Sequence, residues 1–237
     1  MQRLGLLAMA TGLWFFSMQA QARDWGWHLC FEGATDVPVD AGARALMETP
    51  YGLRVGLALG GLPGPYVDLI NAVVVAAGGY DQDTADLVSD SLQNSLVFRI
   101  HGGWRPVEDW GLYIEAGYGL VVLGGGVSGE ELVAAATGVA RPGTELESRG
   151  YEVSSTLHMI DLEVGWEFLF WDRLELRIAL GFAGTLGASA RVQPDFVPRL
   201  LQPVDAFSRA AENYLVDVYK SYVFTPVVTV GLGYQVF

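Results

Sequence analysis

The chain has 237 residues, a formal net charge of −13, and a composition that is 51% hydrophobic but only 17% charged. Soluble domains usually carry about a quarter charged residues, so these proportions do not suit an ordinary water-exposed surface. Lys220 is the single lysine among 14 basic residues, which leaves no basic patch for nucleic acid. A single cysteine excludes an internal disulfide framework.

Residues 1–22 predict an export signal. Arg3 precedes an apolar run from Leu4 to Phe16, and the small-residue site Ala20-Gln21-Ala22 follows. The run is shorter than the roughly 20 apolar residues that a membrane-spanning helix needs. We therefore divide the chain into a signal peptide, 1–22, and a single domain, 23–237.

Beyond residue 22, large apolar residues alternate with small or polar ones, which is the period of a β-strand between two environments. The large residues occupy one face, while glycines and isolated charges occupy the other. The pattern predicts eight strands: 24–32, 37–48, 52–60, 95–105, 111–123, 156–170, 174–189 and 221–237.

Short and long links alternate along these strands, as they do in outer-membrane barrels. The short links are 49–51, 106–110 and 171–173; the long ones are 61–94, 124–155 and 190–220, and only the link 33–36 departs from the pattern. Lipid admits only helices and closed barrels. The predicted fold is therefore all-β: an eight-stranded antiparallel transmembrane β-barrel with helical extracellular loops.

The long links contain helix patterns. Residues 65–77 and 81–93 read as a helical hairpin, 129–138 as a short Ala-rich helix, and 203–219 as an amphipathic helix. Asp81 and Asp83 suit the start of the second helix; a calcium site formed with Asp86 and Asp90 is the alternative. Such helices need an apolar partner, so we expect either a cap over the barrel mouth or contact with lipid or another protein.

The inward face of the strands carries charges that are predicted to form a network in the lumen. Its members are Glu48, Arg54, Arg99, Glu115, Asp161, Glu163, Glu167, Glu175 and Arg177. Across the turn at 171–173, residues whose numbers sum to 344 should face each other, which places Glu167 opposite Arg177. Glu48 and Arg54 should likewise meet across Pro50-Tyr51. An eight-stranded interior is filled by side chains, so we expect a closed polar core; a narrow cation-preferring channel is the alternative.

Tryptophans gather toward the end of the barrel that has the short links. Six of them are predicted to form one aromatic girdle: Trp25, Trp27, Trp104, Trp110, Trp166 and Trp171.

No catalytic residue, cofactor or metal ligand is predicted. Ser154 and His158 lie four strand residues apart, about 13 Å, beyond the reach of a serine and its base; Ser155 adds no better pair. An outer-leaflet lipid-modifying enzyme is therefore only the third hypothesis for the function. His28 and His101 point inward without a predicted third ligand, and Cys30 is expected to fill space in the lumen.

The ending Val230-Gly231-Leu232-Gly233-Tyr234-Gln235-Val236-Phe237 resembles the aromatic-terminated last strand of small outer-membrane barrels of the outer-membrane protein A and X type. The resemblance implies a Gram-negative outer membrane, with outer-membrane lipid around the barrel and the barrel assembly machinery reading Tyr234 and Phe237. Tyr234 has an even number and Phe237 an odd one, so a regular strand would place them on opposite faces. A bulge at Gln235-Val236 would bring both to the lipid face. The leading expectation is a structural or cell-surface interaction role, with a possible partner at loops 61–94, 124–155 and 190–220.

Overall fold

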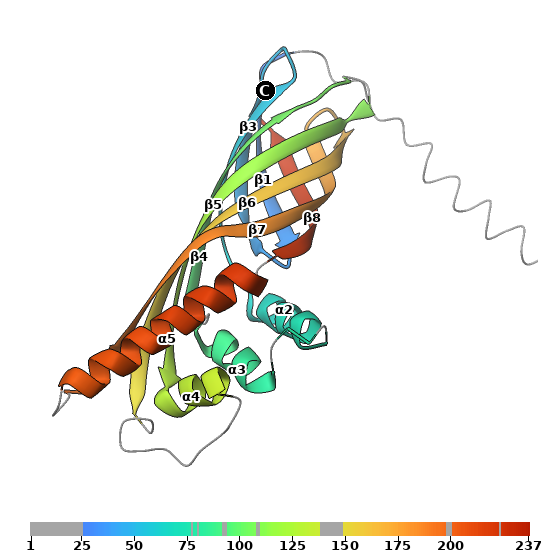
Figure 1. Ribbon diagram of the computed structural model, residues 1–237. Helices are drawn as coiled ribbons and strands as arrows, with labels where there is room; N and C mark the ends of the chain where they lie inside the picture. The colour runs from blue at the N-terminus through green and yellow to red at the C-terminus, as the bar shows by residue number, and fades with distance from the viewer. Residues whose placement is uncertain are drawn as a thin grey trace, which may run out of the picture.

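The computed structural model describes residues 26–76, 78–79, 81–91, 94–107, 110–137, 149–197, 201–222 and 224–237. Within these residues the chain forms one closed barrel, in which each strand pairs antiparallel with the next and β8 closes on β1 (Figure 1). The strands are β1 (His28–Val37), β2 (Asp40–Glu48), β3 (Leu53–Gly61), β4 (Asn94–Trp104), β5 (Leu112–Ser128), β6 (Gly150–Phe170), β7 (Leu174–Pro194) and β8 (Phe224–Gln235). The predicted fold class is thus confirmed.

In the described part of the chain, the helices lie in the connections at one end of the barrel, which we call the helical end (Figure 1). They are α2 (Gly64–Ala76), α3 (Gln82–Ser91), α4 (Gly129–Thr137) and α5 (Leu201–Tyr222). The opposite end, the short-turn end, carries the β2–β3, β4–β5 and β6–β7 connections and the C-terminus. All four helices lie within about three residues of their predicted positions.

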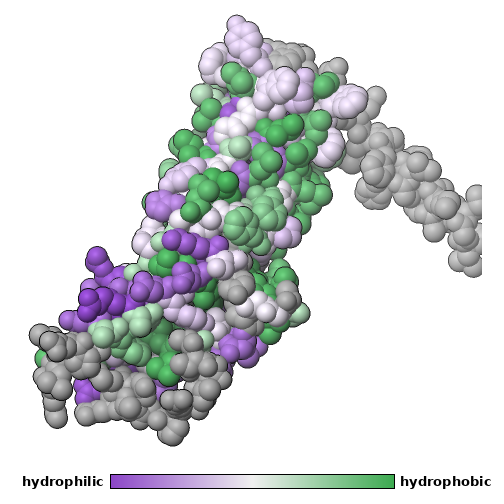
Figure 2. All heavy atoms as spheres, in the orientation of Figure 1, coloured by the Kyte–Doolittle hydropathy of each residue, from purple (hydrophilic) through white to green (hydrophobic). Residues whose placement is uncertain are grey.

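The outer face of the barrel is apolar, as strand parity predicts. In β3, for example, Leu53, Val55, Leu57 and Leu59 are about half exposed, while Arg54 between them is 1% exposed. Figure 2 shows hydrophobic side chains along the barrel wall and a hydrophilic surface over α5 at the helical end.

Strand register also follows the sequence. Glu48 pairs with Arg54 across the β2–β3 turn, and Glu167 pairs with Arg177 across the β6–β7 turn. The second pair has the predicted sum of 344.

The boundaries of the first and last strands correct the prediction. β1 spans His28–Val37 rather than 24–32, so the predicted link 33–36 lies within the strand, and the turn falls at Pro38-Val39. Residues 33–36 pair with both β2 and β8, which accounts for their extended conformation. At the other end of the chain, Tyr222 belongs to α5 and β8 begins only at Phe224.

Besides β1, three strands extend well beyond their predicted bounds toward the helical end. β6 and β7 have 21 residues each and β5 has 17, whereas β2 and β3 have nine. A tilted strand crosses a bilayer with about 9–11 residues. The barrel wall is therefore high along β5, β6 and β7 and low along β8, β1, β2 and β3 (Figure 1).

The high wall packs against the cap helices. Above the membrane-length part of the strands, inward residues such as Val127, Val153 and Val192 are buried in one hydrophobic cluster with Leu87 of α3 and Leu215 of α5. A β-bulge where β7 faces His158 and Met159 leaves Leu186 unpaired, so the inward face of β7 changes from odd residues to even ones. This shift turns Val192 toward α5.

Candidate functional site in the lumen and loop cap

Buried arginines and carboxylates from strands β1 to β7 meet inside the lumen. Their side chains are almost completely removed from solvent, and no more than 8% of any paired side chain is exposed. The arginines are Arg44, Arg54, Arg99, Arg105 and Arg177. Buried guanidinium groups are stable only when carboxylates satisfy them, so the arrangement is a set of mutually dependent pairs.

Arg54 of β3 lies at the centre of the cluster nearest the short-turn end. Its Nε donates to Glu115 Oε1 at 2.6 Å, and its Nη1 donates to Glu167 Oε2 at 2.9 Å and to Glu48 Oε2 at 3.2 Å. Its guanidinium carbon lies 4.2 Å from the centre of the Tyr113 ring. Because Glu115 and Glu167 come from β5 and β6, Arg54 joins opposite sides of the barrel.

Arg105 is a member of this cluster that the sequence prediction omitted. It follows β4, and its Nε and Nη2 donate to the two oxygens of Glu48 at 2.8 and 3.0 Å; it also pairs with Glu167. The sequence held the signal for it. Arg105 follows Arg99 and His101 at odd, inward positions and is the last residue of the predicted strand 95–105.

A second cluster surrounds Arg177 of β7. Its Nη1 lies 2.8 Å from Glu163 Oε1 and its Nη2 lies 2.8 Å from Glu32 Oε1, while Arg44 contacts both of these carboxylates and Glu115. Arg177 thus points into the lumen and meets Glu163, one of the carboxylates within its predicted reach. Its register partner Glu167 binds Arg54 and Arg105 instead.

A third cluster lies toward the helical end. Arg99 Nη2 lies 2.7 Å from Asp40 Oδ1 and also contacts Asp36, and Arg99 Nη1 lies 3.9 Å from Asp161. His101 Nε2 is 3.3 Å from Asp161 Oδ2. Asp36, like Arg105, was absent from the predicted network, because the predicted link 33–36 removed it from the strand.

Glu175, the remaining predicted lumen residue, is also buried on the inward side of the barrel. It is 1% exposed on the inward face of β7, opposite Gly233 of β8 and Leu169 of β6. The other eight predicted residues are all within one of the three clusters.

Glycine makes room for the network. A Cβ atom added to Gly117 of β5 would lie 2.5 Å from Asp161 Oδ1 and from His101 Cδ2, closer than any real Cβ contact. At Gly102 of β4, by contrast, an added Cβ would meet nothing within 4 Å. The small inward residues therefore reflect a lumen that is already full.

The predicted girdle residues in the described part of the chain all lie toward the short-turn end and are well exposed. They are Trp27, Trp104, Trp110, Trp166 and Trp171, with exposed fractions from 46% to 85%. Trp25 lies outside the described residues.

The two C-terminal aromatic residues both face outward. Tyr234 is 49% exposed and Phe237 is 60% exposed, while Gln235 between them is buried. Leu29 of β1 accepts a hydrogen bond from the Val236 N–H and donates one to the Phe237 carbonyl, so two residues oppose one at this point. The bulge that lets both aromatic residues face outward therefore lies at Val236-Phe237, opposite Leu29, and not at the predicted Gln235-Val236.

The cap is one connected unit. Asn71 of α2 donates to the Ala85 carbonyl of α3 at 2.8 Å, and the Tyr214 hydroxyl of α5 donates to the Ala135 carbonyl of α4 at 2.8 Å. The Glu212 carboxylate of α5 accepts a bond from the Val192 N–H of β7 at 3.0 Å, which fixes the cap to the high wall.

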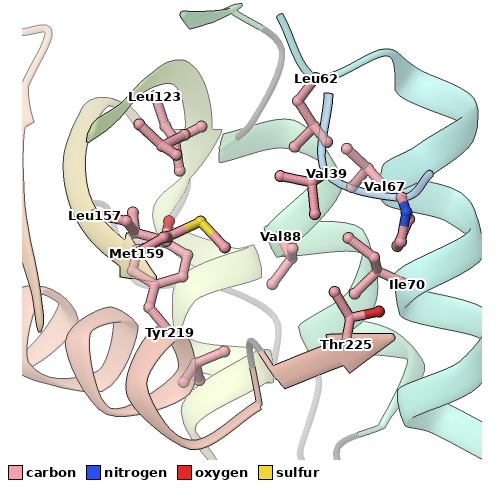
Figure 3. Close-up of a pocket in the computed structure, with 13 residues that line it drawn as sticks. Val39, Leu62, Val67, Ile70, Val88, Leu123, Leu157, Met159, Tyr219 and Thr225 are labelled. Atoms are coloured by element: carbon pink, nitrogen blue, oxygen red, sulfur yellow. The ribbon is translucent and has the colours of Figure 1, made fainter. Parts of the chain in front are cut away.

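An apolar cavity lies between the cap and the inward face of the barrel (Figure 3). Its volume is about 70 Å³. A cavity needs about 10–15 Å³ by this measure to hold one water molecule, so the space suits a small group or a short segment of a longer ligand. The sequence prediction missed this cavity, because it depends on three separate connections, β1–β2, β3–β4 and β7–β8, meeting above the barrel.

The residues considered for catalysis do not come together. His158 faces outward and its Nδ1 lies 2.5 Å from the Tyr118 hydroxyl, while Ser155 faces inward and donates to the Tyr219 hydroxyl at 3.4 Å; Ser154 is exposed. Asp81 caps α3 through Thr84. In the described ranges, no group of three or more His, Cys, Asp or Glu side chains is arranged to hold a metal ion. None of the described helices is long and apolar enough to cross a membrane.

No protein-family model matches the chain, and no curated protein matches it in sequence. The fold resembles several solved structures at low identity. The N-terminal β-barrel domain of Pseudomonas aeruginosa OprF aligns at 8% identity and a TM-score of 0.41, covering 88% of this chain and 96% of that one. Acinetobacter baumannii CarO2 aligns at 13% identity (TM-score 0.38; 88% and 98% covered), and a major outer membrane protein from Thermus thermophilus at 12% identity (TM-score 0.44; 88% and 98% covered).

Proposed function

We propose that this chain is an outer-membrane β-barrel whose lumen does not conduct and whose helical cap serves a structural or cell-surface role. The observation that carries the proposal is the cluster around Arg54, Arg105, Glu48 and Glu167. These side chains cross the lumen and are between 0% and 5% exposed, so they leave no continuous water path. The apolar outer face and the export signal predicted at residues 1–22 support the membrane location.

Conductance in planar bilayers tests the closed lumen. We expect the purified, folded protein to give no stable open steps in the voltage range that opens porins. Stable cation-selective steps would overturn the proposal. Arg54→Ala is the informative variant, because removing one guanidinium opens space in the cluster and leaves the carboxylates in excess.

The cation-preferring channel is the second candidate, and one observation favours it: carboxylates outnumber arginines in the lumen. A conducting pore would be selective for cations because rings of carboxylates attract them. The same bilayer recording therefore decides between the two candidates.

We also propose that the protein is not an enzyme. Mass spectrometry of the lipids from cells with and without the protein should give the same acyl-chain pattern. A lipid species that appears only when the protein is present would contradict this.

A further inference from the structure

The cavity below the cap offers almost no polar group to a ligand. Its walls are aliphatic side chains: Leu123, Leu157 and Met159 on the barrel side face Val67 and Ile70 of α2 across the open space (Figure 3). The Tyr219 hydroxyl accepts a hydrogen bond from Ser155, and the Thr225 hydroxyl donates to the Pro226 carbonyl at 3.1 Å. Both hydroxyls in the lining are therefore already used within the protein.

The chemistry of the lining restricts what can occupy it. An ordered water needs two to four polar partners, and a charged or hydrogen-bonding group would lose its hydration without compensation. An alkyl chain has no polar group to desolvate, so it can occupy such a lining without this cost. The cavity therefore fits a hydrocarbon chain.

The cavity opens on one side. Of the residues that line it, only Leu62, Ile70 and Thr225 are partly exposed; the others are buried. Leu62 follows β3, Thr225 is the second residue of β8, and the β1–β2 turn at Pro38-Val39 lies between those strands. The opening is therefore above the low side of the barrel wall.

Helix α2 borders this opening and is itself apolar on both sides. Val67 is 3% exposed toward the cavity, while Leu69 and Val73 on the other side are 46% and 61% exposed, and Asp68 is the only charge among its 13 residues. Figure 2 shows the hydrophobic surface of the barrel continuing onto the side of the cap where α2 lies. In the proposed membrane location, this face adjoins the lipid at the helical end of the barrel.

We propose that the cavity binds a linear alkyl chain that enters sideways from the membrane, over the β1–β2 turn and beneath α2. The proposal rests on the membrane location argued above and not on a closed lumen. The chain can be the acyl tail of a membrane lipid or a free hydrocarbon, since both present the same chemistry to the lining.

Two adjacent valines of β5 provide a matched pair for the test. Val121 points into the cavity and is 5% exposed, whereas Val122 points outward and is 44% exposed. Val121→Phe fills the cavity, and Val122→Phe makes the same change on the outer face. The probe is the apolar dye 1-N-phenylnaphthylamine with protein in lipid nanodiscs, displaced by 1-bromododecane.

We expect saturable dye binding that 1-bromododecane displaces, with the Val121→Phe variant about tenfold weaker and the Val122→Phe variant unchanged; tenfold corresponds to about 1.4 kcal/mol. Binding that is the same in both variants, or not saturable beyond empty nanodiscs, would overturn the proposal. If Val121→Phe fails to fold, Val88→Phe of α3 fills the cavity from the cap without altering a strand, and the same outcomes apply.

Native mass spectrometry of these samples distinguishes the two sources. Retention of a phospholipid by the wild type but not by the cavity-filling variant assigns a lipid acyl chain, and retention of 1-bromododecane alone assigns a free hydrocarbon. Retention of neither, or equal retention by both variants, contradicts the proposal. Conductance plays no part in this readout, so failure of the closed lumen and failure of the cavity site are seen separately.

Discussion

Arg54 shows how a single residue sets the stability of the lumen. Three carboxylates and the Tyr113 ring surround its guanidinium, and the side chain is fully removed from solvent. Breaking one partner of a buried ion pair costs far more than the net contribution of the pair, because the remaining charge stays buried.

Arg54→Met should therefore destabilise the folded barrel by about 3–5 kcal/mol, measured by urea unfolding in detergent micelles. Arg173→Met is the control. Arg173 lies exposed in the β6–β7 turn with its Nη1 2.9 Å from the Tyr234 hydroxyl, and exposed contacts of this kind contribute roughly 0–1 kcal/mol. Equal losses in the two variants would mean that the lumen network does not hold the barrel together.

Gly117 tests how tightly the lumen is filled. We expect Gly117→Val to cost about 1–3 kcal/mol through overpacking, because the new side chain would collide with Asp161 and His101. Gly102→Val, which meets open space, should be nearly neutral. The heat-induced shift in gel mobility that separates folded from unfolded barrels measures both, and a neutral Gly117→Val would show that the lumen has room to spare.

Among the secondary-structure elements, α3 has the best-defined start. Asp81 Oδ1 accepts hydrogen bonds from the Thr84 N–H at 3.0 Å and from the Thr84 hydroxyl at 2.8 Å, as expected of an N-cap. These bonds hold the pKa of the Asp81 carboxyl below its usual value. The helix α4 begins with a capping box. The Ser128 hydroxyl accepts a hydrogen bond from the Glu131 N–H, and the Glu131 carboxylate accepts one from the Ser128 N–H.

The lowered pKa of Asp81 gives the start of α3 a pH dependence. A carboxyl whose pKa is lower in the folded state stabilises above its unfolded pKa, near 3.9, and loses that contribution as the pH falls through the folded value. Amide hydrogen exchange at Thr84 and Ala85, corrected for intrinsic rates, should therefore accelerate below about pH 4. Asp81→Asn keeps a capping oxygen without a titrating group, so its protection should not change over this range; an identical pH response in both proteins would contradict the assignment.

At the scale of the whole molecule, the barrel has two different ends. Exposed tryptophans lie at the short-turn end, and the helices form the other end, with an apolar wall between them. Tryptophan prefers the membrane–water interface, where its ring is partly buried and its N–H stays hydrated.

This arrangement predicts the depth of the tryptophans in a bilayer. Phospholipids brominated near the carbonyl region should quench the fluorescence of the folded protein more strongly than phospholipids brominated at the chain ends, because Trp104, Trp110 and Trp171 lie at the rim. Stronger quenching by the lipids brominated at the chain ends would contradict a tryptophan girdle at the membrane–water interface. Trp171→Phe should reduce the signal without changing the order of the two quenchers.

The sequence by itself determined the architecture, because its signals are local. Alternation within each strand decides which side chains face lipid, and a closed barrel is the only way that strands can cross a membrane. Tight turns then set the register of neighbouring strands, which is why the pairs Glu48–Arg54 and Glu167–Arg177 were predictable. A helix cap such as Asp81 is also predictable from the sequence, because it involves only residues within three positions of each other.

Only the tertiary structure decided which charges meet inside the lumen and what the loops enclose. Arg54 of β3 binds Glu167 of β6 because the tilt and stagger of the strands place these two residues at the same height in the lumen. No local sequence pattern encodes this tilt and stagger. The same holds for the high wall of β5, β6 and β7, whose extra residues stay extended because the cap helices pack on them. The apolar cavity arises where that wall, the low β1–β2 turn and three cap helices converge, so it exists only once the chain has folded.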